Sequence, residues 1–220
     1  MCELLKADMT IQIKNFLEMS YDELEENNLK AKARVASHAS EDTLKEDYLR
    51  FLTDTKALKA ITVGFSDLEG RFHMLDYDKK FLVKSYENLT FDGSSIRGFS
   101  VVRESDLRLE IDWGSFRWLP SDVFGAGKVF VFGLIRDKDD KAYYSTDMRA
   151  RLKDLCTQLW KKDKTAAYAA VEIEGFLFEG QNAEQNYSSW DGFKFVSNGG
   201  YYNSLPKDPL KLFIDKFAEA

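Results

Sequence analysis

The sequence predicts an α+β protein, and three observations carry this prediction. A polar segment with helical patterning fills the first quarter of the chain, short apolar runs separated by turns follow over residues 58–135, and an amphipathic helical pattern begins near residue 146. Strands that gather around a single helix, rather than alternating with helices, are typical of the α+β class. The chain has 220 residues, 44% of them hydrophobic, which is enough for one large domain or two modest ones.

The N-terminal segment, residues 1–57, is expected to form two or three helices. Residues 20–23 read Ser-Tyr-Asp-Glu, the pattern of a capping box at a helix start. Ser40 is followed by two acidic residues, which are favoured at the positive end of the helix dipole. Tyr48 and Leu52 then recur at helical spacing. The sequence therefore predicts a helical N-terminal extension.

The middle segment, residues 58–138, carries strand-like runs and is expected to form a small α+β domain. Runs at 61–65 and 71–75 flank an Asp-Leu-Glu-Gly turn, which is the pattern of a β-hairpin with a short loop that contains glycine. Residues 78–86 fit a short helix. Further strand-like runs lie at 98–102, 107–111 and 128–135.

The last segment, residues 139–220, follows a charged turn and is expected to form a third region. Apolar residues recur every three or four positions through a helix predicted at 146–161, and Cys156 falls on that apolar side, where we expect it to be buried. Residues 169–178 have the composition of a buried strand. A final helix is expected to open at Asp208, which precedes a proline.

Composition argues against several classes of protein. The formal net charge is −6, without the basic excess that a general nucleic-acid or anionic-membrane surface needs. The sequence has no apolar run of the roughly 18 residues that would span a bilayer, and its first residues lack a signal-peptide pattern. We therefore expect no nucleic-acid or membrane partner. The two cysteines lack CxxC spacing, so we expect a reduced, cytoplasmic setting.

One short loop concentrates polar side chains beside glycine. Residues 91–99 read Phe-Asp-Gly-Ser-Ser-Ile-Arg-Gly-Phe, so Asp92 is followed closely by the hydroxyls of Ser94 and Ser95. Such a group can bind a cation or an amine. The same residues can instead form a turn in which the side chains cap their own backbone, and the residues alone leave both interpretations open.

Two glutamates in the last segment form a candidate metal site. Glu172 and Glu174 are two residues apart, and in a strand such residues point to the same side. Adjacent carboxylates repel one another unless a proton or a metal ion lies between them, and Mg²⁺ prefers oxygen ligands of this kind. A solvent-facing strand with two ordinary glutamates is an equally good interpretation of the residues by themselves.

Three stretches of the chain occur in an order that is typical of one enzyme family. The first stretch begins with Phe-Asp-Gly-Ser-Ser at 91–95 and ends with Glu-Ser-Asp-Leu-Arg-Leu at 104–109. Residues 171–178 read Val-Glu-Ile-Glu-Gly-Phe-Leu-Phe, and residues 199–202 read Gly-Gly-Tyr-Tyr. Together these stretches resemble the glutamine synthetase family, and the resemblance extends over residues 58–220.

The resemblance implies a fold and an activity. Residues 58–138 would form a β-grasp domain, and residues 139–220 would form the incomplete opening of an α/β catalytic domain. Members of the family are ATP-dependent ligases that form γ-glutamyl phosphate from glutamate and then let ammonia displace the phosphate. They assemble as ring-shaped homo-oligomers in which each site is shared between two chains. Glutamate, ammonium, ATP and further copies of the chain are therefore the expected partners.

The resemblance also assigns roles to particular residues. It implies that Glu172 and Glu174 bind divalent cations, Mg²⁺ or Mn²⁺, and that Asp92, Ser95 and Tyr201 are catalytic residues that line the ammonium pocket.

Departures from the family pattern leave the exact acid and amine open. Gly175 stands where the family has an aromatic residue, and residues 109–112 read Leu-Glu-Ile-Asp in place of Leu-x-Pro-Asp. Family members are also much longer, so we expect this polypeptide to be inactive as a ligase by itself. Two other readings stay open from the residues: a short non-catalytic paralogue that acts as an oligomerisation or regulatory module, and an unrelated α+β binding module.

Overall fold

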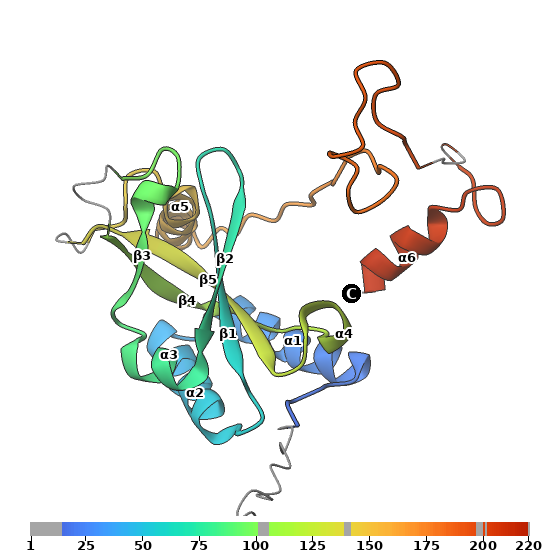
Figure 1. Ribbon diagram of the computed structural model, residues 1–220. Helices are drawn as coiled ribbons and strands as arrows, with labels where there is room; N and C mark the ends of the chain where they lie inside the picture. Colours follow the sequence, from blue (N-terminus) through green and yellow to red (C-terminus); the bar gives the residue numbers. More distant parts are fainter. Residues whose placement is uncertain (1–14, 101–105, 139–141, 197–199, 201, 220) are drawn as a thin grey trace, which may run out of the picture. The chain divides into compact units, whose positions relative to one another are not determined.

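The computed structural model describes residues 15–100, 106–138, 142–196, 200 and 202–219. The chain divides into two compact units, Met1–Ala166 and Ala167–Ala220. The first unit holds a twisted sheet with helices packed on it (Figure 1). In the part of the chain that is described, no helix is both long enough and apolar enough to cross a membrane.

A five-stranded sheet in the order β2-β1-β5-β4-β3 forms the centre of the first unit (Figure 1). β1 runs parallel to β5, and the other neighbouring strands are antiparallel. This mixed sheet with helices beside it confirms the predicted α+β class. The strands are β1 Ala60–Ser66, β2 Phe72–Asp78, β3 Leu89–Asp92, β4 Asp106–Trp118 and β5 Lys128–Arg136.

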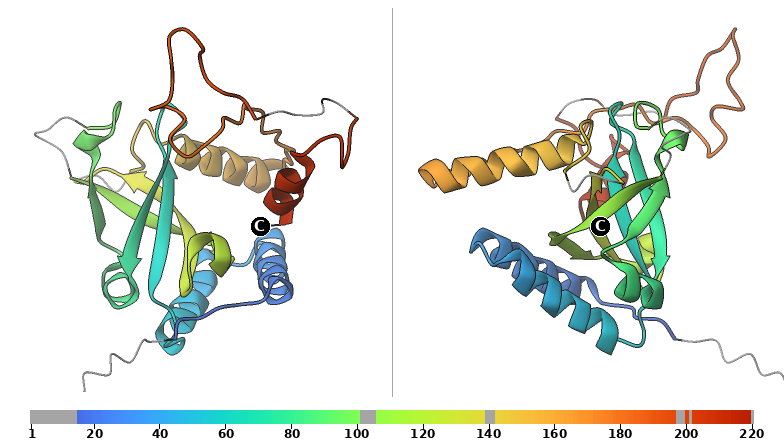
Figure 2. Two further views of the ribbon diagram at one scale, coloured as in Figure 1. Left: turned by 45° about the vertical axis from the view of Figure 1, so that its right-hand side comes forward. Right: turned by 90° about the vertical axis from the view of Figure 1, so that its left-hand side faces the viewer.

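The predicted N-terminal helices are confirmed, together with their caps. Ser20 and Glu23 form a reciprocal capping box, and the Ser40 side chain accepts a hydrogen bond from the backbone N–H of Thr43. Both helices pack against β4. The core side chains of α2 meet Trp113 and Phe116 of that strand, whereas α5 meets Asp112, which points to the other face of the sheet. The right-hand view of Figure 2 shows α5 above this pair of helices. The helices of this unit are α1 Tyr21–Ala36, α2 Glu41–Asp54, α3 Lys79–Ser85, α4 Ser121–Phe124 and α5 Met148–Asp163, with a 3-10 turn η1 at Gly93–Ser95.

Apolar packing between the sheet and α2 and α3 forms the core. Leu52, Leu82 and Phe116 are completely buried, and the ring of Tyr48 stacks on Phe116 with 4.2 Å between centroids. Burying one side chain of this size contributes about 1.5–3 kcal/mol. Tertiary packing of this kind, rather than helix propensity, provides most of the stability of short helices such as α2.

The predicted hairpin is confirmed, whereas one predicted strand is wrong. β1 and β2 pair as antiparallel neighbours around the expected turn. Residues 98–100 lie in a turn and a bend rather than in a strand, because Gly98 adopts the left-handed region with φ of 85°; residues 101 and 102 of that prediction lie outside the described residues. The edge strand is instead β3, which pairs with β4.

The helix predicted at 146–161 is present as α5, but it docks with a different face. Met148, Leu152 and Leu155 are each more than half exposed, and Cys156 is exposed rather than buried as expected. The side of α5 that carries Arg149 and Lys153 faces β4, where both side chains pair with the buried carboxylate of Asp112. Ion pairing, rather than the apolar stripe, therefore orients this helix.

The prediction of a buried strand at 169–178, in the second unit, is wrong. Val171 and Ile173 are 84% and 81% exposed, and the described residues there form no strand ladder. A strand needs a neighbour for its backbone groups, and Phe178 makes an isolated bridge to Phe195. The last helix, α6, spans Lys211–Glu219 and begins three residues after the predicted N-cap, Asp208.

Candidate functional site

Asp92 ends β3 and is held by the hydroxyls that follow it. Its Oδ1 accepts hydrogen bonds from the Ser94 backbone N–H (3.0 Å) and from Ser94 Oγ (2.6 Å), and its Oδ2 accepts one from Ser95 Oγ (2.9 Å). These donors favour the ionised form, so the pKa of Asp92 lies below its usual range. The group is exposed and presents a fixed negative charge to solvent.

The core beneath this loop determines where Asp92 points. Gly93 is buried, and a Cβ at that position would lie 2.5 Å from Leu107 Cδ1 and 2.7 Å from Ser100 Oγ. Phe91 packs its ring against Phe65 of β1 with 4.8 Å between centroids. A side chain at Gly93 would therefore displace the loop or the strand below it.

The tip of the β1–β2 hairpin contacts the loop that follows Asp92, and the sequence did not predict this contact. Arg97 Nη1 lies 3.1 Å from Glu69 Oε1, and this ion pair joins the two turns. The hairpin tip is itself held by Asp67, which accepts hydrogen bonds from the backbone N–H groups of Glu69 and Arg71, each at 2.9 Å. The Asp-x-x-Gly spacing at 67–70 was the available signal, because an Asp side chain often closes such a turn.

The ring of His73 adds a third contact to Asp67. His73 Nε2 lies 2.8 Å from Asp67 Oδ2, and the ring nitrogen donates because an ionised carboxylate can only accept. This contact is the largest cause of the lowered pKa of Asp67, and the two backbone donors act in the same direction. The charged form of Asp67 is thus part of the hairpin's structure.

The five predicted site residues have different outcomes in the structure. Asp92 and Ser95 are brought into hydrogen-bond contact. Glu172 and Glu174 lie in exposed, irregular chain, and Tyr201 lies outside the described residues. The residues that the structure describes contain no group of three or more His, Cys, Asp or Glu side chains that could hold a metal ion. Two exposed carboxylates without a third ligand do not by themselves fit a divalent-cation site.

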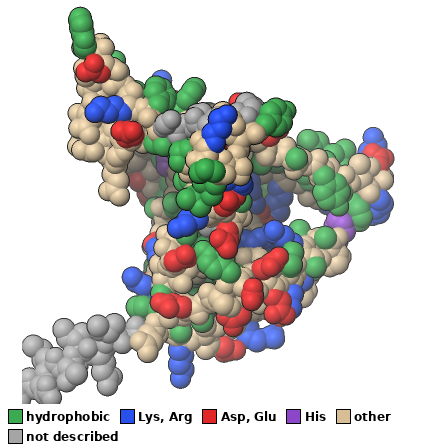
Figure 3. All heavy atoms as spheres, turned by 90° about the vertical axis from the view of Figure 1, so that its right-hand side faces the viewer, with side chains coloured by type: hydrophobic (Ala, Val, Ile, Leu, Met, Phe, Trp, Pro, Cys, Tyr) green, Lys and Arg blue, Asp and Glu red, His purple; other side chains and the backbone are tan. Residues whose placement is uncertain are grey.

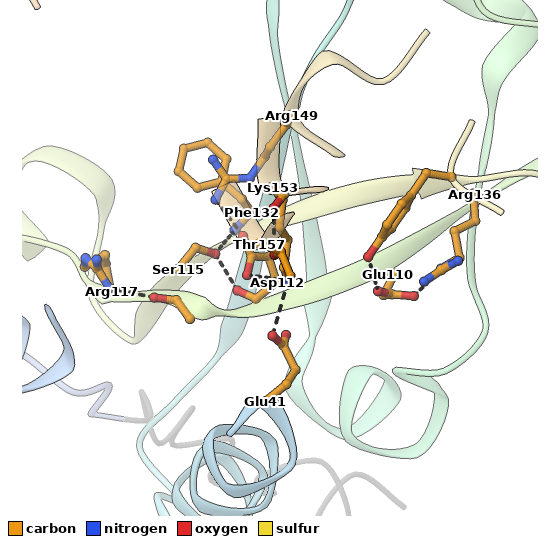
Figure 4. A network of polar contacts seen from close by, with 12 residues as sticks. Glu41, Glu110, Asp112, Ser115, Arg117, Phe132, Arg136, Arg149, Lys153 and Thr157 are labelled. Carbon is orange, nitrogen blue, oxygen red and sulfur yellow. Dashed lines mark hydrogen bonds and ion pairs between the residues drawn. The ribbon is translucent and has the colours of Figure 1, made fainter. Parts of the chain in front are cut away.

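A polar network on β4, β5 and α5 was also missed from the sequence (Figure 4). Asp112 accepts from Arg149 Nη2 at 2.7 Å and from Lys153 Nζ at 3.1 Å, and Lys153 also reaches Glu41 at 3.2 Å. Burial alone would lower the pKa of Lys153, but the two carboxylates outweigh burial and raise it. The network holds α5 to the sheet and to the start of α2.

A second part of the network lies on the neighbouring positions of the sheet. Arg136 donates to Glu110, and this hydrogen bond raises the pKa of the guanidinium. Tyr143 Oη donates to the same carboxylate at 3.2 Å, and the Arg136 guanidinium lies over the Tyr143 ring. On the face drawn in Figure 3, described basic side chains lie among acidic ones rather than in a separate basic patch.

Comparison with known proteins relates the chain to one family. The family model described as "Glutamine synthetase, beta-Grasp domain" matches residues 57–134. The chain is 28% identical to the glutamine synthetase of Thermotoga maritima over 159 residues, which is 72% of this chain and 35% of that protein. It is 30% identical to a Staphylococcus aureus glutamine synthetase over 173 residues, 76% of this chain and 36% of that protein.

A similar solved structure is the Plasmodium falciparum glutamine synthetase, with a TM-score of 0.47, 19% identity, and coverage of 53% of this chain and 22% of that one. The chain thus spans about a third of the length of the curated relatives that it matches.

Proposed function

Because residues 57–134 belong to the β-grasp domain family of glutamine synthetases, we propose that this chain is the N-terminal portion of a glutamate–ammonia ligase. In the proposed reaction the ATP γ-phosphate passes to the side-chain carboxylate of glutamate, and ammonia then displaces phosphate from the γ-glutamyl phosphate. The observation that carries the proposal is that the matched domain presents the exposed carboxylate of Asp92 at its surface, held by the hydroxyls of Ser94 and Ser95. That group has the charge needed to attract ammonium.

We propose that Asp92 acts mainly by binding the cation. A carboxylate whose pKa is lowered stays charged at neutral pH, and so it attracts ammonium continuously. The same lowering makes it a weak base, so proton removal from ammonium needs the product ammonia to be consumed at once by the acyl phosphate. Ser95 fixes the carboxylate through its hydroxyl, and Tyr201 is proposed to line the same pocket.

Glu172 and Glu174 are proposed to contribute to a Mg²⁺ or Mn²⁺ site of the complete enzyme. A bound divalent cation would neutralise charge on the transferring phosphoryl group. The support for this role is the acidic pair in the motif at residues 171–178. The roles proposed above for Asp92 and Ser95 rest on hydrogen bonds and charge, and they involve no metal ion.

The proposed assembly is a ring-like homo-oligomer in which the Asp92 loop completes the site of a neighbouring subunit. Exposure of this loop on the first unit supports the proposal, because a buried loop could not reach another chain. We further propose a helical extension at 1–57, the β-grasp domain at 58–138 and part of a catalytic domain at 139–220, in a cytoplasmic protein.

A domain exchange tests the proposed function. Residues 57–134 of this chain would replace the corresponding β-grasp domain of the Thermotoga maritima glutamine synthetase, and glutamine formation from glutamate, ammonium and ATP would be measured. We expect the chimera to assemble and to form glutamine. In the chimera, Asp92→Asn should reduce the rate by about 100-fold or more, the scale expected when one preorganised electrostatic contact is lost from a site.

Glu87→Gln is the matched control, because Glu87 is an exposed carboxylate of the same domain outside the Asp92 loop. It should leave the rate unchanged. An assembled chimera that forms glutamine equally well with Asn at position 92 would contradict the proposed role of Asp92, and an assembled chimera with no activity at all would contradict the proposed function.

A further inference from the structure

A cavity of about 630 Å³ that is open to solvent lies on the first unit, between α5, the junction of α1 and α2, and β4. Much of its wall is apolar or aromatic: Val35, Leu44, Phe132 and Trp160 all line it. The ring of His38 stacks on Trp160 at a centroid distance of 3.7 Å and an angle of 19°, which makes one wall flat. A cavity with this lining favours a ligand that has an apolar or aromatic body.

The polar side of the cavity is nearly balanced in charge. Arg149 and Lys153 contribute two positive charges, and Asp112 and Glu41 contribute two negative charges that pair with them. The Arg149 guanidinium also lies over the Phe132 ring, 4.0 Å from its centroid. These four groups therefore balance one another in charge, although Nε of Arg149 is buried and has no hydrogen-bond partner among the described residues.

Arg117 adds one positive charge that the described residues do not neutralise. It lines the cavity, and its Nη1 donates to the backbone carbonyls of Phe116 (2.6 Å) and Gly114 (3.4 Å) rather than to a carboxylate. Burial is the largest cause that lowers the pKa of Arg117, and the positive charge of Arg149 acts in the same direction, whereas Tyr48 and the carboxylate of Asp112 act against it. Asp112 and Glu41 already pair with Arg149 and Lys153. The three cations and two carboxylates that line the cavity therefore keep one net positive charge, and one negative charge from a ligand would be stabilised here.

A bulge in β4 creates this arrangement. The register between β4 and β5 shifts between Asp112 and Arg117. Ser115 fixes the bulge by donating to the Asp112 carbonyl (2.6 Å) and accepting from the Phe132 backbone N–H (2.7 Å). Bulges often redirect side chains beside binding sites, and this one turns Arg117 to the same side as Asp112.

From these observations we propose that the cavity binds a small organic monocarboxylate with an apolar or aromatic body. One unneutralised guanidinium matches one carboxylate, and its planar fork can bind both oxygens at once. A phosphate dianion would leave excess negative charge next to Asp112. Part of the wall comes from α1 and α2, outside the residues 57–134 that match the β-grasp family. The site is therefore separate from the proposed ligase function and does not depend on it.

Calorimetric titration of the full chain with sodium 3-phenylpropionate tests the proposal, with the neutral 3-phenylpropanamide as the matched ligand. We expect the carboxylate to bind about tenfold or more tightly than the amide, the factor expected for one charge-assisted hydrogen bond. Arg117→Met should remove that preference. Arg50→Met, an arginine on the exposed face of α2 away from the cavity, should leave it unchanged.

A second variant tests the cavity independently of the charge. Thr157 lines the cavity from α5, so Thr157→Phe should fill it and weaken binding by about tenfold or more while Arg117 is retained. Circular dichroism would establish whether each variant is folded. If Arg117→Met does not fold, the binding measured with Thr157→Phe tests the proposal in its place. Absence of carboxylate binding, equal binding of the amide, or binding unaffected by Thr157→Phe would each overturn the proposal.

Discussion

Gly93 shows how a single residue connects the candidate site to the core. It follows Asp92 directly and sits against Leu107, which is buried in β4. The position needs glycine because of space rather than because of an unusual backbone angle, since a Cβ would lie far inside contact distance of the Leu107 side chain. The direction of the Asp92 carboxylate thus depends on packing one residue away.

We predict that Gly93→Ala destabilises the first unit by about 1–3 kcal/mol, the usual cost of overpacking a core position. Urea denaturation monitored by circular dichroism would measure the change. Gly175→Ala is the matched control, because nothing lies within 4 Å of a Cβ at that glycine. Equal stability of the two variants would mean that the loop relaxes without cost.

The charge of Asp67 should make the stability of the fold depend on pH. The pKa of Asp67 is lower in the folded chain than in the unfolded chain, where an Asp has a pKa of about 3.9. The charged carboxylate therefore stabilises the fold at pH values above this unfolded pKa. The stabilisation is lost as the pH falls through the lower, folded pKa. Asp67→Asn should therefore lower the free energy of unfolding at pH 7. The free energy of unfolding of this variant should also fall less steeply as the pH is lowered from 5 to 3.

Urea denaturation at several pH values would measure both effects. Glu25→Gln serves as the control, since Glu25 is exposed on α1. A decline in stability that is as steep in Asp67→Asn as in the unmodified chain would show that other carboxylates account for it.

At the scale of elements, α5 illustrates a helix placed by polar contacts. Its N-cap, Asp147, is buried and accepts a hydrogen bond from the Ala150 backbone N–H at 3.1 Å. The other oxygen of the same carboxylate accepts one from the Ile135 backbone N–H of β5 at 2.6 Å. One side chain thus caps the helix and ties it to the sheet, and Arg149 and Lys153 then fix its rotation through Asp112.

We predict that Asp147→Ala lowers the free energy of unfolding by roughly 1–3 kcal/mol, because a cap is lost and a buried N–H is left without its partner. Hydrogen exchange should also show faster exchange at Ile135 and through the first turn of α5. Gln158→Ala, at an exposed position of the same helix, should change neither measurement. Unchanged exchange at Ile135 would contradict the role assigned to Asp147.

At the scale of the whole molecule, the two units differ in how they bury apolar side chains. Every residue of the buried hydrophobic cluster belongs to the first unit. In the second unit, the residues that resemble a catalytic strand are exposed, and the chain spans about a third of the length of its curated relatives. A complete ligase site has to hold ATP, glutamate and cations at once, and the described residues contain no group of three or more His, Cys, Asp or Glu side chains that could hold a metal ion.

We predict that the 220-residue chain has no ligase activity by itself. The measurement is phosphate release that depends on ATP, glutamate and ammonium, with the complete Thermotoga maritima glutamine synthetase as the positive control. Added Mg²⁺ or Mn²⁺ should not restore turnover, because two exposed carboxylates do not complete the shell of either cation. Turnover by the purified chain would show that these residues suffice for catalysis.

Local signals in the sequence determined the α+β class, the two capped N-terminal helices and the β1–β2 hairpin. For the Asp92 loop, they included a turn that caps its own backbone as one of two interpretations, and the structure contains that hydrogen bond. Each depends on residues within a few positions of one another, where capping, turn chemistry and periodicity act directly.

Tertiary structure alone decided which face of α5 docks, the bulge that turns Arg117 toward Asp112, and the ion pair between Glu69 and Arg97. The exposed course of residues 169–178 belongs with these, although their composition predicted a buried strand. Each of these outcomes depends on a partner far away in the chain, or on the lack of a strand ladder among the described residues, and no local pattern encodes such a partner.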